Sequence, residues 1–247
     1  MMGSDYGETP SIRRAMRFPS WHLVANVARK GREELRRRLR RSLPGQFQPY
    51  SHTSVNRYPW LFEFAKASIG DGAAIRLLSF GCSRGDEVFS LREYFPKALI
   101  KGIDINARNI AFCLTRAQTQ ESAGLSFAVA ASVEREPAES YDAIFCLAVL
   151  CLGDLTNFYA QRCDPHLYFV DFERIVQDFA RCLKPSGLLF LHTTNFRFSD
   201  TAAASDFAVA LEADPARLAP DLVFDRDNRL LRGVRYLPVA FRKRSDR

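Results

Sequence analysis

The sequence predicts an α/β fold with a doubly wound, largely parallel sheet of seven strands. Short apolar runs alternate with amphipathic segments from Ile75 to Thr194, and this alternation is typical of parallel strands joined by right-handed helical crossovers. Residues 221–244 then follow the pattern of a strand, a polar turn and a longer strand. This ending predicts a C-terminal antiparallel hairpin at the edge of five parallel core strands.

The spacing of apolar residues predicts the individual elements. Pro59 suits the first turn of a helix that ends at Gly70. Residues 201–219 have the pattern of a helix or a loop. The other predicted strands are 75–80, 98–105, 125–130, 141–150 and 188–194, and the other predicted helices are 86–95, 107–118 and 171–184.

Composition and length are those of one globular domain with a sizeable core. The chain has 247 residues, of which 47% are hydrophobic and 26% are charged. No apolar run approaches the roughly 20 residues that a membrane span needs, and we see no apolar segment of a secretory signal. The six cysteines form no C-x-x-C pair. We therefore expect reduced, mostly buried thiols in a cytoplasmic protein without a metal site.

The positive charge is concentrated near the N-terminus. Residues 11–42 carry eleven Lys or Arg and two Glu, whereas the whole chain has a net charge of +7, so the other residues together have a charge of −2. This distribution disfavours a catalytic domain that binds nucleic acid over a broad surface. An apolar stripe from Trp21 to Leu39 predicts an amphipathic helix over 20–41. Three roles stay open for this leader, residues 1–43: docking on the domain, binding a membrane surface, or binding nucleic acid.

A glycine-containing loop follows the first predicted strand and opens the next helix. It runs from Gly81 to Glu87 with the sequence GCSRGDE. Ligands of a doubly wound sheet bind beyond the C-terminal ends of the strands, next to such a loop, and its glycines let a ligand approach the backbone. Asp104 ends the second strand nineteen residues after Gly85, where an acid typically binds ribose hydroxyls. The predicted ligand therefore contains a ribose.

Two acids at the start of the helix disfavour a dinucleotide. Asp86 and Glu87 stand where a pyrophosphate would bind the helix N-terminus, and the G-x-G-x-x-G fingerprint is absent. The same carboxylates suit a cationic ligand without phosphate, such as S-adenosylmethionine with its sulfonium and α-ammonium groups. The structural alternative is that they only complement the helix dipole, by about 0.3–1 kcal/mol each.

Four motifs, in this order, resemble those of class I S-adenosylmethionine-dependent methyltransferases. They are LLSFGCSRGDEVFSL (77–91), IKGIDIN (100–106), YDAIFCLAVL (141–150) and ARCLKPSGLLFLH (180–192). The resemblance implies a Rossmann-like sheet with helices on both faces, S-adenosylmethionine as the cofactor, and a terminal hairpin of the kind predicted above.

The cofactor loop is most similar to that of the chemotaxis-receptor methyltransferases. Ser79 replaces an acid, and Ser83 replaces the middle glycine, that class I enzymes usually have. The preceding segment HTSVNRYPWLFEF (52–64) resembles the same branch. However, Leu147 and Ala148 replace the Arg-Asn of that family, and the basic leader stands in place of its N-terminal helical domain. These departures disfavour receptor glutamate as the acceptor.

The resemblance also implies roles for individual residues. Thr53 and Arg57 approach the cofactor, Glu87 contacts its methionine end, and Asp104 binds its ribose. The predicted cofactor-binding residues are Thr53, Arg57, Gly81, Cys82, Ser83, Gly85, Glu87, Asp104, Ile105, Asn106, Ser132, Cys146 and Leu147.

The sequence identifies no catalytic base. The candidates are His192 at the end of the fifth strand, Asp154 after the fourth strand, and His52 near the predicted lid; capping or core packing is the structural alternative for each. A hydroxyl or ammonium acceptor needs a base, whereas a carboxylate acceptor does not. Asn195 and Arg197, beyond the fifth strand, are either contacts of a polar or anionic acceptor or ordinary loop residues.

We therefore predict two parts, the leader 1–43 and a methyltransferase domain 44–247. The domain divides into a lid and helix (44–70), a cofactor-binding core (71–194) and an acceptor-side segment with the terminal hairpin (195–247). The favoured function is methyl transfer to a small-molecule, saccharide or protein acceptor at oxygen. An RNA methyltransferase tethered by the leader is the second hypothesis, although no Asn/Asp-Pro-Pro-aromatic motif for base methylation follows the fourth strand. A non-catalytic, methyltransferase-like binding protein is the third. The oligomeric state does not follow from the sequence.

Overall fold

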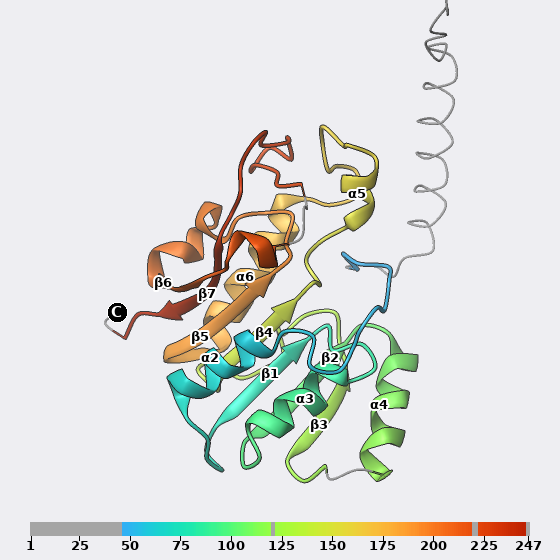
Figure 1. Cartoon of the computed structure of the whole chain (residues 1–247), viewed down its shortest axis with the longest axis vertical. Helices are drawn as coiled ribbons and strands as arrows, with labels where there is room; N and C mark the ends of the chain where they lie inside the picture. Colours follow the sequence, from blue (N-terminus) through green and yellow to red (C-terminus); the bar gives the residue numbers. More distant parts are fainter. Residues whose placement is uncertain (1–45, 120–121, 219–221, 246–247) are drawn as a thin grey trace, which may run out of the picture.

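Figure 1 presents the computed structural model of the chain, which describes residues 46–119, 122–218 and 222–245. The leader 1–43, with its expected amphipathic helix over 20–41, lies outside the described residues. The described chain forms a seven-stranded sheet with the strand order β3-β2-β1-β4-β5-β7-β6. The first five strands pair in parallel, and β7 runs antiparallel to both of its neighbours.

Strands alternate with helices through the first part of the sheet, as the sequence predicts. The strands are β1 (Arg76–Phe80), β2 (Leu99–Asp104), β3 (Leu125–Val129), β4 (Tyr141–Leu147), β5 (Leu183–His192), β6 (Phe207–Glu212) and β7 (Pro238–Lys243). The α-helices are α2 (Pro59–Ile69), α3 (Asp86–Tyr94), α4 (Ala107–Thr119), α5 (Gly153–Asn157) and α6 (Phe169–Cys182). Short 3-10 helices are η1 (Phe198–Asp200), η2 (Ala202–Asp206) and η3 (Pro215–Arg217).

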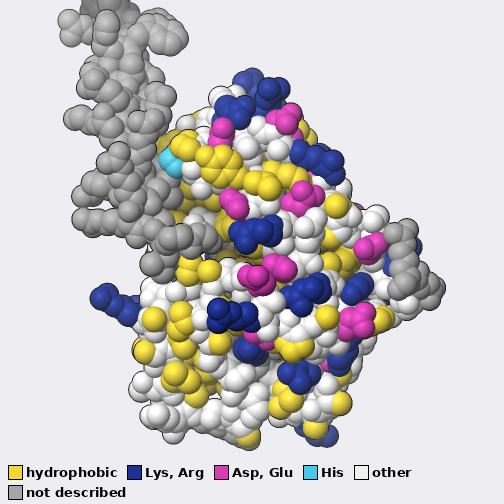
Figure 2. All heavy atoms as spheres, turned by 180° about the vertical axis from the view of Figure 1, so that it is seen from behind, with side chains coloured by type: hydrophobic (Ala, Val, Ile, Leu, Met, Phe, Trp, Pro, Cys, Tyr) yellow, Lys and Arg dark blue, Asp and Glu magenta, His cyan; other side chains and the backbone are white. Residues whose placement is uncertain are grey.

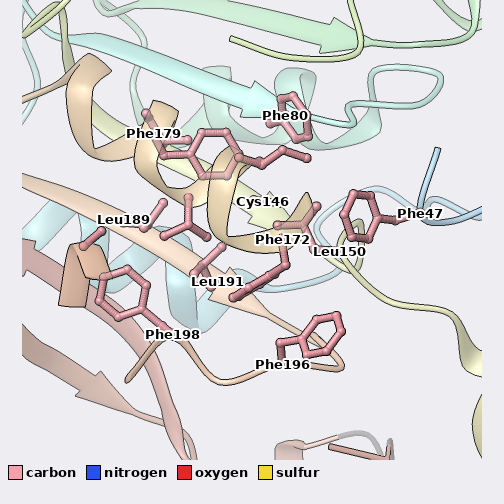
Figure 3. Close-up of a cluster of buried hydrophobic side chains, with 14 of the residues drawn as sticks. Phe47, Phe80, Cys146, Leu150, Phe172, Phe179, Leu189, Leu191, Phe196 and Phe198 are labelled. Carbon is pink, nitrogen blue, oxygen red and sulfur yellow. The ribbon is translucent and has the colours of Figure 1, made fainter. Parts of the chain in front are cut away.

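Helices cover both faces of the sheet (Figure 1). Side chains of α2, α3 and α4 pack in one apolar layer, and those of α6 pack in the other. Successive strand residues point to opposite faces, so Phe145 of β4 joins the first layer whereas Cys146 joins the second, among the phenylalanines that Figure 3 displays. Because both faces of the central strands are buried in apolar layers, polar groups that bind a ligand are confined to the strand ends.

The C-terminal strand pair is present, but its first strand lies earlier in the chain than predicted. β6 (Phe207–Glu212) pairs with β7, although its alanine-rich sequence has the pattern of a helix or a loop. Pairing along the sheet edge outweighs this local preference. The predicted strand near Phe224 is wrong, because that residue makes only isolated bridges with Phe196 and Leu230. Residues 213–218 and 222–237 instead belong to the connection between β6 and β7, and several of them lie against the end of β5.

Two boundaries in the middle of the sheet also differ from the prediction. β4 ends at Leu147 instead of Leu150, because Ala148 has a left-handed φ of 58° that turns the chain away. The following apolar residues are buried in the layer under α6, so their hydrophobicity does not mark a strand. β5 already begins at Leu183, directly after α6, and its pairing with β4 is irregular at this first part.

The remaining expectations concern thiols, membranes and charge. All six cysteines are buried and free. Among the described residues, no helix has the length and apolarity that crossing a membrane would take. Figure 2 shows Lys, Arg, Asp and Glu side chains interspersed over one face of the described body, without a continuous basic field there.

The stacked rings of Phe145 and Phe190 join the two central strands β4 and β5. Their centroids are 4.6 Å apart and their planes differ by 6°, and both side chains are fully buried. We expect Phe145→Ala to lower the free energy of unfolding by about 3–5 kcal/mol, because it leaves a cavity. Urea denaturation followed by circular dichroism measures this loss.

The control for this prediction is Phe112→Ala, which removes a ring that is 49% exposed. That change should alter the free energy of unfolding by less than about 1 kcal/mol. Equal effects of the two substitutions would contradict the packing of β4 against β5.

Candidate active site

A cavity opens at the C-terminal ends of β1, β2 and β4, where the strand order changes direction. The space between its walls, including the mouth, is about 940 Å³, which suits a small-molecule ligand. The loops after the strands form one side, and residues 46–58, here called the strap, supply most of the other. The cavity therefore occupies the switch point at which doubly wound sheets bind ligands.

The loop after β1 contains three left-handed residues in alternation. The φ angle is 74° at Gly81, 50° at Ser83 and 87° at Gly85. A Cβ atom on Gly81 would lie 2.5 Å from the Val149 side chain, so a larger residue would clash there. Ser83 adopts the left-handed region despite its Cβ, which is uncommon for a residue other than glycine. Serine therefore preserves the backbone shape of the missing middle glycine.

The hydroxyl of Ser83 also fastens the strap to the loop. Its Oγ donates a hydrogen bond of 3.2 Å to the carbonyl of Ser51. Asn109 of α4 donates from its Nδ2 atom to Ser51 Oγ, also at 3.2 Å. One strap residue is thus held by the loop after β1 and by the helix after β2, and it closes the cavity between them.

The Asp104 carboxylate at the end of β2 organises the same region. Its Oδ2 accepts a hydrogen bond from the Ser83 N–H at 2.8 Å. Its Oδ1 accepts from the Asn106 N–H at 2.8 Å and from Asn109 Nδ2 at 3.1 Å. The side chain is 8% exposed and lines the cavity. Since each carboxylate oxygen can accept two hydrogen bonds, Oδ2 keeps one position for a ligand hydroxyl.

Glu87 contributes a second carboxylate to the cavity wall. Its Oε1 accepts a hydrogen bond of 2.7 Å from Ser79 Oγ in β1. Burial raises the pKa of Glu87 to about 8, although the Ser79 hydrogen bond and the Arg57 guanidinium act in the opposite direction. An acid in place of Ser79 would bring two carboxylates together, whereas serine supplies a donor. Arg57 of the strap also lines the cavity, which therefore contains charges of both signs.

Only one of the two acids that open α3 faces the ligand space. Asp86 Oδ1 pairs with Arg116 Nη1 at 2.6 Å, and Asp86 is not part of the cavity wall. Arg116 in turn lies over the Phe89 ring, 4.1 Å from its centroid. Asp86 thus joins α3 to α4, and Glu87 alone of the pair is available to a ligand.

Most of the predicted cofactor-binding residues converge on the cavity. Those in its wall are Thr53, Arg57, Gly81, Cys82, Ser83, Glu87, Asp104, Ile105, Asn106 and Leu147. They come from the strap, from the loops after β1 and β2, from the first turn of α3 and from the end of β4. Three other predicted residues, Gly85, Ser132 and Cys146, are not in the wall.

Backbone geometry explains two of these three exceptions. A Cβ atom on Gly85 would lie 3.0 Å from Cys113 Sγ, so this glycine serves the turn and the packing of α3 on α4. The side chain of Cys146 points into the layer under α6 (Figure 3). Strand alternation directs the next residue, Leu147, to the cavity instead.

Ser132 is displaced by the way the chain leaves β3. The Ala130 N–H donates to the Asp104 carbonyl at 3.1 Å, so the pairing with β2 continues one residue beyond the strand. Ala130 and Ala131 consequently line the cavity. Ser132 follows them, and Val133 enters the apolar core.

Two of the three candidate bases meet at Tyr50, which the sequence analysis did not identify. His52 is exposed, lines the cavity, and stacks on the Tyr50 ring at 5.9 Å between centroids. Asp154 is outside the cavity wall, and its Oδ2 accepts a hydrogen bond of 2.7 Å from the Tyr50 hydroxyl. Asp154 therefore holds the strap, and only His52 has direct access to the cavity.

His192, the third candidate, is buried at the end of β5 and lies outside the cavity wall. Its ring packs against those of Tyr58 at 4.8 Å and Trp60 at 5.9 Å. Burial lowers the pKa of His192 to about 4; the Arg217 main chain opposes this shift and Arg57 adds to it. Nε2 has no hydrogen-bond partner of ordinary geometry in the described chain. His192 is therefore neutral at pH 7.

Asn195 and Arg197, the candidate acceptor contacts, form internal interactions. Asn195 is fully buried, accepts a hydrogen bond from the Leu152 N–H at 2.6 Å and donates to the Leu222 carbonyl at 2.7 Å. The Arg197 guanidinium makes a two-pronged pair with Asp200 at 2.8 and 2.9 Å. Both residues serve the loop conformation.

Phe47, Tyr50 and Tyr58 of the strap also line the cavity, although their positions were not predicted from the sequence. Asn109, which links Asp104 to Ser51, was not predicted either. Phe47 and Tyr50 precede the motif-like segment 52–64 and carry no local signal, whereas an asparagine in the first turn of the helix after an acid is a signal that could have been used. Within the described ranges, no cluster of three or more His, Cys, Asp or Glu side chains is arranged to hold a metal ion.

Comparisons with known proteins agree with this geometry. A family model described as a methyltransferase domain matches residues 71–224. No curated protein matches the chain. Solved structures with a similar fold include methyltransferases, and several of those are complexes with S-adenosylmethionine or S-adenosylhomocysteine.

Three solved structures illustrate the extent of the similarity. Phosphoethanolamine N-methyltransferase 2 of Haemonchus contortus is 16% identical with a TM-score of 0.43, over 66% of this chain and 31% of its own. Geranyl diphosphate C-methyltransferase of Streptomyces coelicolor is 18% identical with a TM-score of 0.40, over 53% and 42%. The YcgJ protein of Bacillus subtilis is 21% identical with a TM-score of 0.42, over 55% and 51%.

The chain thus spans about a third to a half of the length of these proteins. Their identities and TM-scores are too low to carry any argument about the acceptor. The family model, in contrast, covers more than half of the chain, including every strand from β1 to β6. The chain therefore belongs to the methyltransferase domain family.

Proposed function

We propose that the cavity under the strap binds S-adenosylmethionine and that the enzyme methylates an oxygen atom of a small-molecule, saccharide or protein acceptor. The observation that carries the proposal is that one cavity contains Asp104, Glu87 and Arg57 together. A ribose hydroxyl needs a hydrogen-bond acceptor such as Asp104. An α-ammonium needs an anion such as Glu87, and an α-carboxylate needs a cation such as Arg57. The cofactor has all three groups.

The residues of the cavity fit this cofactor without a phosphate site. Asp104 Oδ2 has an acceptor position for a ribose hydroxyl, and the loop from Gly81 to Ser83 lets the ligand approach the backbone. Ile105, Ala131 and Leu147 supply an apolar wall for the adenine ring. Thr53 of the strap lies in the same wall as Arg57 and is proposed to bind the methionine end with it.

The chemistry of the transfer requires alignment and exclusion of water more than an elaborate set of catalytic groups. When bound, S-adenosylmethionine would be held by Asp104, Glu87 and Arg57 and would supply a methyl group on a positively charged sulfur for transfer to the acceptor oxygen. The strap excludes water and holds the reactants in line. A hydroxyl acceptor also loses its proton, for which His52 is the base at the cavity, whereas a carboxylate acceptor loses none.

The absence of one motif supports oxygen as the methylated atom. The contacts of two serines support a cofactor-binding mode of the chemotaxis-receptor type. Residues 148–150 after β4 are Ala-Val-Leu, so the motif that serves amino groups of bases is absent. Ser79 bonds to Glu87 and Ser83 bonds to the strap, so both serines that distinguish that branch have a function in the site. The acceptor is proposed to differ from that branch, because Leu147 and Ala148 replace its Arg-Asn pair.

Cofactor binding should be linked to the release of a proton from Glu87. The free protein holds this carboxyl with a pKa of about 8, so most of it is protonated at pH 7, whereas a bound α-ammonium favours the ionised form. We expect the affinity for S-adenosylhomocysteine to rise as the pH increases from 6 to 8 and to level off above pH 8. Calorimetry in phosphate and in Tris measures the proton released.

Glu87→Gln is the control for this linkage. It should weaken binding at least about tenfold at pH 8, where a carboxylate interaction is lost, and it should remove the dependence on buffer. Binding by the wild type that neither changes with pH nor releases a proton would contradict the role of Glu87.

Asp104 should be essential for cofactor binding, because it contacts both the surrounding loops and the proposed ribose. We expect Asp104→Asn to weaken S-adenosylhomocysteine binding at least about tenfold, because the amide replaces a charged acceptor of three hydrogen bonds. Asp142→Asn is a matched control, since Asp142 also accepts a backbone N–H, from Arg76 at 2.8 Å, but lies outside the cavity. Calorimetry and thermal melts compare the variants; equal affinities would rule out the proposed site.

Methyl transfer itself can be followed with labelled cofactor. We expect the wild-type protein, incubated with methyl-labelled S-adenosylmethionine and fractionated cell extract, to label small molecules, saccharides or proteins. Glu87→Gln should reduce the label at least about tenfold. Label recovered in RNA would overturn the proposed acceptor class, and a protein that binds the cofactor but labels no fraction would favour the non-catalytic alternative.

A further inference from the structure

Two buried thiols meet behind the loop that follows β1. Cys82 belongs to that loop and Cys113 to α4, and the two side chains are 2% and 0% exposed. Both Sγ atoms lie near one acceptor, the Ser83 carbonyl oxygen, which is 3.8 Å from Cys82 Sγ and 3.3 Å from Cys113 Sγ. The two thiols also form a hydrogen bond with each other. Two separate elements thus bring together a pair of thiols that the proposed methyl transfer does not use.

Two glycines make room for the sulfur atoms of this pair. A Cβ atom on Gly102 of β2 would lie 3.0 Å from Cys82 Sγ, and a Cβ atom on Gly85 would lie 3.0 Å from Cys113 Sγ. Side chains at these two positions would therefore press on the sulfur atoms, since a protein interior is closely packed. The slot between β2, the loop and α4 holds the two thiols against each other.

The contact between the two thiols makes them chemically unequal. Their hydrogen bond lowers the pKa of Cys113 against the effect of burial, whereas the same bond and burial together raise the pKa of Cys82. The thiolate is the form that attacks another sulfur atom, so Cys113 is the better nucleophile of the pair. Cys82 belongs to the wall of the cofactor cavity, so it is the member nearer to a small molecule that enters the empty cavity.

The loop that carries Cys82 also carries contacts on which the cofactor site depends. Ser83 donates its N–H to Asp104 Oδ2 at 2.8 Å and its hydroxyl to the Ser51 carbonyl at 3.2 Å. The sulfur atoms of a disulfide are only about 2.0 Å apart, closer than two thiols joined by a hydrogen bond. A bond between Cys82 and Cys113 would therefore draw the loop toward α4 and displace Ser83 from its partners.

We propose that Cys82 and Cys113 form a reversible disulfide, with a peroxide as the oxidant, and that this disulfide weakens cofactor binding. Formation of the disulfide is independent of the proposed function, whereas its effect on binding rests on that function. A bound cofactor fills the cavity beside Cys82 and thereby protects the pair from the oxidant. The cofactor loop is thus a modification site that responds to oxidation.

The reaction takes two steps and consumes one molecule of hydrogen peroxide. The Cys82 sulfur attacks one peroxide oxygen, the O–O bond breaks, and the departing hydroxide takes the thiol proton and becomes water. The Cys113 sulfur then attacks the sulfur of the sulfenic acid, the S–O bond breaks, and the second hydroxide takes the remaining thiol proton. Two thiols are oxidised to one disulfide, and one peroxide is reduced to two molecules of water.

Peroxide treatment of the full chain tests the proposal. Calorimetry first measures the affinity of the reduced protein for S-adenosylhomocysteine. After treatment with hydrogen peroxide and alkylation of the remaining thiols, mass spectrometry of unreduced peptides should detect a cross-link between Cys82 and Cys113. We expect S-adenosylhomocysteine to bind at least about tenfold more weakly after treatment, because the displaced loop loses a hydrogen bond to a charged group. Dithiothreitol should restore the affinity, and S-adenosylhomocysteine added before the peroxide should slow the cross-linking.

Cys113→Ser and Cys182→Ser are matched variants for this experiment. Cys182 is also a fully buried cysteine of a helix, and its thiol faces the Val133 carbonyl at 3.7 Å, but it lies outside the cavity wall. The affinity of each variant is compared before and after peroxide, so that any effect of the substitution itself cancels. Cys113→Ser should abolish both the cross-link and the loss of affinity, whereas Cys182→Ser should retain both.

Three results would overturn the inference. They are absence of the cross-link after peroxide, a cross-link that leaves the affinity unchanged, and a loss of affinity that persists in Cys113→Ser. If the reduced protein does not bind S-adenosylhomocysteine, the proposed function is contradicted, and mass spectrometry still decides whether the disulfide forms. Circular dichroism melts verify folding, and Cys82→Ser takes the place of Cys113→Ser if the latter does not fold.

Discussion

The site depends on the hydrogen bonds that the Asp104 carboxylate accepts from Ser83, Asn106 and Asn109. These donors belong to the loop after β1, the turn after β2 and the first part of α4, so one buried anion fixes three segments. A net contribution of about 1.5–3 kcal/mol is typical of a hydrogen bond to a charged group. The group proposed to bind ribose is therefore also the group that shapes the loop, and a change at Asp104 alters affinity and local order together.

Electrostatics at the other carboxylate work against stability and in favour of binding. Burial raises the pKa of Glu87 above its unfolded value, so the stability of the free protein falls as the pH rises from about 4.5 to 8 and is constant above that range. The Ser79 hydroxyl and Arg57 limit this cost without removing it. A cationic ligand beside Glu87 would stabilise the ionised carboxylate further and offset the rest of this cost. The ionised site is therefore unfavourable when empty and favourable when a cation is bound.

How much of this arrangement follows from the sequence depends on the range of the interactions. The positions of Asp104 and Glu87 follow from short-range rules, namely strand ends, loop spacing and the first turn of a helix. Tyr50 does not, because its partner Asp154 is 104 residues away and no motif joins them. Cys146 and Leu147 were both predicted to bind the cofactor, but neighbouring residues of a strand point to opposite faces, so only Leu147 lines the cavity. Thr193 carries no unusual sequence signal at all, since its strained φ of 58° appears only once β5 meets the end of β4.

The strap also sets a constraint on what the basic leader does. Gln46 lines the cavity, and Gln48 donates to Cys151 Sγ at 3.5 Å, so the chain that joins residues 11–42 to the domain is itself part of the cavity wall. Polar contacts of Ser51, Tyr50 and Asn56 hold the strap to the loop after β1, to α4, to α5 and to α3. A partner that binds the leader changes access to the cofactor only if it favours one arrangement of these contacts over another.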